Sequence, residues 1–165
     1  MSGIIGVGPN MRSGIIGAFP TDHVINYKRT TGVGRTYNAT NSWNYAHPNL
    51  VMTYTAKSAS SLLLLTANYN YKKEDSGYFN ADFYKNASDF TETYNLSGLT
   101  YGITQNSQGG GNGFYQTFQT WLDTANTTNE ITYKITTRSN DSGNCVVGYY
   151  TDGNLMQFTV TELAV

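Results

Sequence analysis

The chain has 165 residues, with 10 Lys and Arg against 11 Asp and Glu, so its formal net charge is -1. This balance lacks the excess of cations that drives generic nucleic-acid binding through counterion release. No basic run is present that would hold the chain on an anionic membrane, and the length fits one domain with a core of its own. We therefore expect neither a nucleic-acid partner nor insertion into a membrane.

The polar content is mostly uncharged. Only 13% of the residues are charged, yet the mean hydropathy is -0.42, and the chain contains 14 Tyr and 17 Gly. Helices favour Ala, Leu, Glu, Lys and Arg, whereas Thr and Tyr suit pleated surfaces and Asn and Gly suit the turns between strands. The composition predicts an all-β protein.

The residues that usually carry chemistry are few. Cys145 is the single cysteine, which excludes an intrachain disulfide and any zinc site built from two or four cysteines of this chain. His23 and His47 are the two histidines, and they stand in no metal-binding spacing. The sequence therefore indicates a protein that is not an enzyme and that needs no metal or other cofactor.

The first 22 residues contain a short repeat, because Ser-Gly-Ile-Ile-Gly at residues 2–6 recurs at residues 13–17. Glycine and proline disfavour a helix here, while the paired isoleucines favour burial. We expect an extended N-terminal arm over residues 1–22 that covers a surface of another chain or of its own sheet edge. The residues expected to anchor this arm on that surface are Ile4, Ile5, Val7, Ile15, Ile16 and Phe19.

From residue 23 onward the pattern predicts about eight to ten short strands separated by turns. Residues 38–48 are predicted as an aromatic loop, and residues 105–113, which include four glycines, as a flexible loop. The predicted strands are 24–31, 50–56, 62–71, 78–85, 99–104, 114–122, 130–138, 145–150 and 155–164.

Alternation within these strands predicts which side chains face the core. In the last strand the core face is expected to reach solvent at Glu162. The predicted core faces are those of Leu63, Leu65, Ala67, Tyr69 and Tyr71; of Phe79, Ala81 and Phe83; of Ile131, Tyr133 and Ile135; and of Met156, Phe158 and Val160.

This spacing predicts an antiparallel β-sandwich over residues 23–165, and among the compact solutions we favour a jelly roll. Residues 114–122 carry aromatic side chains on both faces, so one face is expected to meet the core and the other a neighbouring subunit. Tyr115 and Trp121 are the candidate interface residues. A homotrimer would also cover strand edges that an isolated sandwich leaves open.

Residues 11–20, MRSGIIGAFP, run into His-Val-Ile-Asn at residues 23–26. This segment resembles the one that opens the C-terminal jelly-roll module of tailed-phage virion proteins, especially fibre proteins of marine and cyanobacterial phages. Residues 61–70, 131–139 and 156–165 resemble the central, penultimate and terminal strands of that module.

The resemblance implies a trimer of jelly rolls on the virion surface, made in the host cytoplasm and bound to a capsid or tail protein. No stalk sequence precedes the module, and the N-terminus lacks the pattern of a secretion signal. The expected role is therefore a head fibre, a capsid decoration or a short tail-fibre component.

Two other functions remain open. A receptor-binding fibre tip would stack aromatic rings on host-surface carbohydrate and bind sugar hydroxyls through nearby amides. The candidate contacts are Trp43, Tyr45, Tyr94 and Tyr101. A polysaccharide depolymerase would need two carboxylates at a fixed separation, but turn chemistry explains most of the acidic residues.

Overall fold

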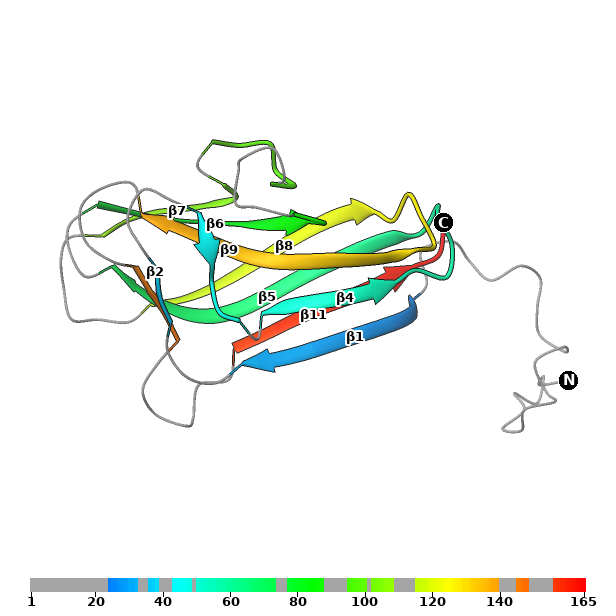
Figure 1. Ribbon diagram of the computed structural model, residues 1–165, viewed down its shortest axis with the longest axis horizontal. Helices are drawn as coiled ribbons and strands as arrows, with labels where there is room; N and C mark the ends of the chain where they lie inside the picture. The colour runs from blue at the N-terminus through cyan, green and yellow to red at the C-terminus, as the bar shows by residue number, and fades with distance from the viewer. Residues whose placement is uncertain are drawn as a thin grey trace, which may run out of the picture.

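The structure is a computed structural model that describes residues 24–32, 36–38, 43–48, 50–73, 77–87, 95–100, 102–108, 115–139, 145–148 and 156–165. For residues 36–38, 73 and 104–108 it describes the backbone only. The described residues form eleven strands in two antiparallel sheets that pack face to face (Figure 1). This arrangement confirms the predicted all-β sandwich.

Sheet A is organised around the long strand β5, which pairs with β8 along one edge and with β11 and then β10 along the other. β1 pairs with the outer edge of β11, and β2 with that of β10. The bounds are β1 Val24–Gly32, β2 Thr36–Asn38, β5 Leu62–Lys73, β8 Tyr115–Thr124, β10 Cys145–Val147 and β11 Met156–Leu163.

Sheet B is organised around β9, which pairs with β6 on one side and with β3 and β4 on the other. β7 pairs with the outer edge of β6. The bounds are β3 Asn44–Tyr45, β4 Val51–Thr55, β6 Gly77–Lys85, β7 Thr104–Gln108 and β9 Glu130–Ser139.

The core lies between the sheets and is built by the period-two alternation of apolar side chains. Aromatic rings meet across it: Phe83 and Phe158 stack with centroids 5.7 Å apart, and Tyr71 and Phe79 with centroids 3.9 Å apart. Every side chain that the sequence placed on a core face is buried. Because buried apolar area is the main favourable contribution to folding, these faces fix the register of both sheets.

The eight longer strands pair in a nested order. β1 pairs with β11, β4 with β9, β5 with β8 and β6 with β7. Among these eight strands the first therefore pairs with the last, the second with the seventh, the third with the sixth and the fourth with the fifth. The chain is thus a long antiparallel ribbon folded over so that its pairs lie alternately in the two sheets.

Two expectations about the strands are wrong. The strand predicted at residues 99–104 is found at Thr104–Gln108, within the predicted glycine loop, because an edge strand is held by backbone hydrogen bonds and needs no apolar face. Glu162 does not reach solvent: it is fully buried, and its carboxylate is bonded inside the sandwich. The predicted arm at residues 1–22 lies outside the described residues.

Candidate functional site

The outer face of sheet B gathers aromatic and polar side chains around Trp43. The Trp43 ring centroid lies 5.8 Å from that of Tyr84, and the Arg138 guanidinium carbon lies 5.1 Å from the Trp43 ring. Trp43 is only 4% exposed. Neighbouring side chains therefore cover most of its ring, and the predicted contact with a sugar stays a prediction.

Tyr45 is the second predicted carbohydrate contact and is half-buried at the end of β3. The ammonium of Lys134 lies 5.2 Å from its ring centroid, a cation-π distance. Tyr94 and Tyr101 lie outside the described residues, so their role stays a prediction. The same holds for the anchoring residues Ile4, Ile5, Val7, Ile15, Ile16 and Phe19.

Asp82 lies fully buried on the same outer face and holds residues 95–100 against β6. One carboxylate oxygen accepts a hydrogen bond of 2.7 Å from the Phe83 amide, and the other accepts one from the Ser97 hydroxyl. Burial raises the pKa of Asp82 to about 6, although the hydrogen bonds from Ser97 and Phe83 act in the opposite direction. The Arg138 guanidinium secures the same segment by donating 3.0 Å to the Thr100 carbonyl.

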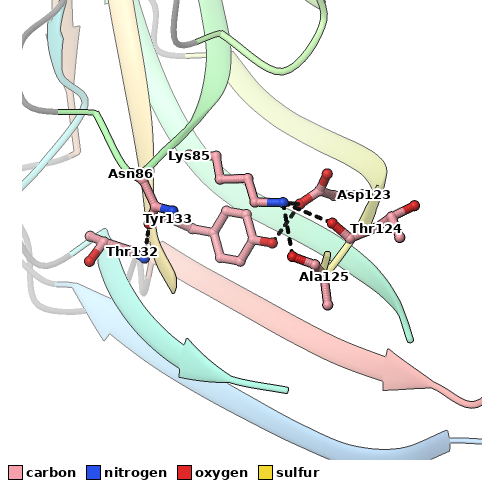
Figure 2. A network of polar contacts seen from close by, with 7 residues as sticks. All are labelled: Lys85, Asn86, Asp123, Thr124, Ala125, Thr132 and Tyr133. Carbon is pink, nitrogen blue, oxygen red and sulfur yellow. Dashed lines mark hydrogen bonds and ion pairs between the residues drawn. The ribbon is translucent and has the colours of Figure 1, made fainter. Parts of the chain in front are cut away.

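A second polar network joins the two sheets at one end of the sandwich (Figure 2). The Lys85 ammonium on β6 lies 2.8 Å from the Asp123 carboxylate on β8, and the two side chains are 19% and 13% exposed. The Tyr133 hydroxyl donates 2.6 Å to the same carboxylate oxygen, and Lys85 also donates 2.8 Å to the Thr124 carbonyl. Burial, together with the bond to Asp123, raises the pKa of Tyr133 above its ordinary range.

A third network surrounds Glu162 on β11. Its carboxylate accepts hydrogen bonds of 2.7 Å from the Tyr54 hydroxyl on β4 and of 2.7 Å from the Lys57 amide. Burial disfavours the charged form, but the hydrogen bonds that the carboxylate accepts, those from Tyr54 and the Lys57 amide among them, outweigh it and lower the pKa of Glu162.

These networks are suited to holding segments together. Each of the three carboxylates accepts bonds from a segment distant in sequence, and two of them join sheet A to sheet B. His47 and Cys145 are buried. No group of three or more His, Cys, Asp and Glu side chains within the described ranges is placed to hold a metal ion. Sequence patterns missed the three networks because their partners come from distant strands.

Strand β8 carries the two predicted interface residues. Trp121 is partly buried and packs against the core, and its place in an interface stays a prediction. Tyr115 is 46% exposed, with its ring centroid 5.9 Å from that of Tyr71. The outward face instead presents Phe118 and Leu122, which are 69% and 52% exposed. Alternation could show that both faces were apolar, but not which of them faced outward.

Comparison with models of known protein families and with curated protein sequences finds no match for this chain. Within the described part of the chain, no helix has the length and apolar character needed to cross a membrane.

Proposed function

We propose that this chain is a structural protein of a bacteriophage virion: a small jelly-roll subunit that forms a homotrimer on the particle exterior. Its role would be that of a head fibre, a capsid decoration or a short tail-fibre component. Residues 1–22 would anchor it to a capsid or tail protein. The resemblance of residues 11–26 to the start of a phage jelly-roll module motivates this proposal.

The nested strand pairing is the observation that carries it. A jelly roll is a long antiparallel ribbon wound into two sheets, which pairs the first strand with the last and the second with the last but one. The pairs β1–β11, β4–β9, β5–β8 and β6–β7 follow that order. Viral capsid domains are among the proteins that use this architecture.

The buried polar networks also favour a structural role. Asp123, Glu162 and Asp82 each bind a partner on another strand or loop of the chain. Such bonds fix the relative positions of sheets and loops, as a subunit of a durable particle requires. This use of carboxylates supports an assembly protein over a depolymerase.

The proposal is tested by locating the protein on phage particles and by measuring its molecular mass in solution. Antibodies raised against the purified chain should label the outside of intact phage particles in immunogold electron micrographs. Light scattering coupled to size exclusion should give three times the subunit mass of 18.2 kDa. A monomer at all working concentrations, together with unlabelled particles, would overturn the proposal.

The anchor is tested separately by deleting residues 2–20. The truncated protein should keep its oligomeric state and its circular dichroism spectrum but lose binding to particles that lack the native protein. Binding equal to that of the full chain would show that the anchor lies elsewhere.

A further inference from the structure

The outer face of sheet A is a continuous surface across four strands. Directly paired residues of antiparallel strands point to the same face, so the register defines rows that cross β1, β11, β5 and β8. One row consists of Tyr27, Thr161, Leu64 and Leu122, and the next consists of Val24, Leu163, Leu62 and Thr124. Two further rows are Arg29, Thr159, Thr66 and Thr120, and Thr31, Gln157, Asn68 and Phe118.

Large apolar side chains on this face are open to solvent. Tyr27 and Val24 on β1 are 67% and 58% exposed, and Phe118 and Leu122 on β8 are 69% and 52% exposed. Exposed apolar residues on the outer strands flank a half-buried centre formed by Leu62 and Leu64. Large apolar side chains exposed together on one face of a soluble protein are a feature of interaction sites.

The face has almost no charge. Among the side chains in these rows, Arg29 is the one charged group, and it lies on β1 at the margin of the sheet. The rest are apolar or are Thr, Asn and Gln. A partner recognised by its charge would find no complement here, whereas another copy of the chain can pack on this face without burying a charge at its centre.

The size of the face suits a stable contact. Four strands about 4.8 Å apart, each about eight residues long at about 3.4 Å per residue, cover a flat footprint of roughly 500 Å². Pleating and side chains increase the accessible surface beyond this footprint. The face therefore approaches the roughly 800 Å² that each partner contributes to a standard protein interface.

We infer that the outer face of sheet A, which includes Leu64, Thr120 and Leu122, is the surface through which copies of this chain associate. This inference rests on the proposed function, because it names the face that a homo-oligomer would use. Its occupant is another copy of the same chain. Contact there would bury the exposed Phe118 and Tyr27 and bring beside a neighbour the edges of β1 and β8 that pair with no other described strand.

The experiment introduces charge on this face. The substitution Thr120→Lys puts an ammonium between the exposed Phe118 and Leu122 on β8 and removes no large apolar side chain, and Phe118→Lys with Leu122→Lys gives a stronger variant. The control is Leu99→Lys, because Leu99 is 55% exposed in a loop that packs on sheet B. Oligomer mass and dissociation constant are measured by light scattering and sedimentation, and folding by circular dichroism.

The expected result is that Thr120→Lys and the double variant raise the dissociation constant by about 100-fold or more, because hot-spot positions of an interface tolerate no buried charge. Leu99→Lys should leave it unchanged. An oligomer that survives both face variants overturns this inference and leaves the proposed homotrimer standing. If the wild-type chain is monomeric and associates only after deletion of residues 2–20, the occupant is the chain's own arm, which also overturns it.

If the face variants dissociate but antibodies find no protein on phage particles, the proposed virion role fails and the assembly face stands. If the wild-type and truncated chains are both monomeric, the inference and the homotrimer fail together.

Discussion

The hydroxyl of Tyr54 donates a 2.7 Å hydrogen bond to the fully buried carboxylate of Glu162 and so joins β4 of sheet B to β11 of sheet A. A carboxylate in the interior is tolerated only when donors replace the water that it loses. Tyr54 and the Lys57 amide are two of those donors. The acidic residue that interrupts the apolar face of β11 is therefore a tie between the sheets.

Removing this donor should weaken the fold. Tyr54→Phe keeps the ring but withdraws one hydrogen bond from a buried charge, so we expect a loss of about 1 to 3 kcal/mol in the free energy of unfolding. Urea denaturation followed by tryptophan fluorescence measures it. Tyr78→Phe is the matched control, because Tyr78 is 41% exposed, and its effect should stay within about 0.5 kcal/mol. Equal effects of the two variants would contradict the assignment.

Glu162 should also affect how the free energy of unfolding changes with pH under acidic conditions. Its pKa is lower in the folded protein than the ordinary value of 4.5, so its charged form stabilises the fold above that pH. This contribution is lost as the pH falls below 4.5 through the lower folded value. Glu162→Gln should therefore flatten the dependence of unfolding free energy on pH in that range. An unchanged slope would show that Glu162 does not titrate with unfolding.

The Lys85–Asp123 pair should contribute more than an ordinary surface ion pair, since both side chains are mostly buried and Tyr133 donates to the same carboxylate. A double-mutant cycle with Lys85→Met and Asp123→Asn should give a coupling energy of about 1 to 3 kcal/mol. The coupling should largely persist in 1 M salt, where exposed pairs are screened with a Debye length of about 3 Å. A coupling energy near zero would mean that apolar packing alone holds the two sheets together at this end of the sandwich.

The contribution of Asp82 to stability should depend on pH in the opposite direction from that of Glu162. Burial raises its pKa from 3.8 to about 6, so the folded protein holds the proton more tightly than the unfolded chain does. Its contribution to stability is therefore greatest below pH 3.8 and is lost as the pH rises through about 6.

Asp82→Asn removes this charge and can keep bonds to Ser97 and the Phe83 amide. We expect it to stabilise the protein at pH 7 by on the order of 1 to 3 kcal/mol, and to have little effect at pH 4. Chemical denaturation at the two pH values measures the difference. Destabilisation at pH 7 would mean that the ionised carboxylate is worth more to residues 95–100 than its burial costs.

Gly102 should be intolerant of a side chain. It has φ +73°, and an added Cβ would lie 2.4 Å from the Ala81 carbonyl oxygen and 3.0 Å from the Trp43 ring. Gly102→Ala should therefore push its loop away from β6 and cost about 2 kcal/mol or more. Gly98→Ala is the control, because Gly98 has φ +65° with no atom within 4 Å of the new Cβ. Its cost should be about 1 kcal/mol, and equal melting temperatures for the two variants would contradict the close approach.

The core strands could be read from the sequence because they bury one face. In β11 and in the second half of β5, alternation of apolar with polar residues left one register in which the apolar set faces inward. β7 carries Thr, Gln, Asn and Ser, so its pairing with β6 depends on backbone groups that no side-chain pattern reports.

For individual residues too, the sequence pattern predicted a position along a strand, whereas contacts with distant residues decided the exposure of the side chain. Trp43 looked like a loop aromatic free to bind a ligand, but Tyr84 and Arg138, more than 40 residues away in the sequence, cover it. On β8, alternation placed Trp121 and Phe118 on opposite faces but did not show which face packs on the core. Pairing with β5 decided that Trp121 turns toward the core and Phe118 toward solvent.

By itself the sequence determined that this chain folds as a sandwich of antiparallel strands, because local alternation and turn residues act between neighbours along the chain. Only the tertiary structure decided which carboxylates tie the sheets together and which apolar face stays open. Those outcomes depend on contacts between distant strands, and a side chain's environment is set by the strands beside and above it rather than by its own neighbours in sequence.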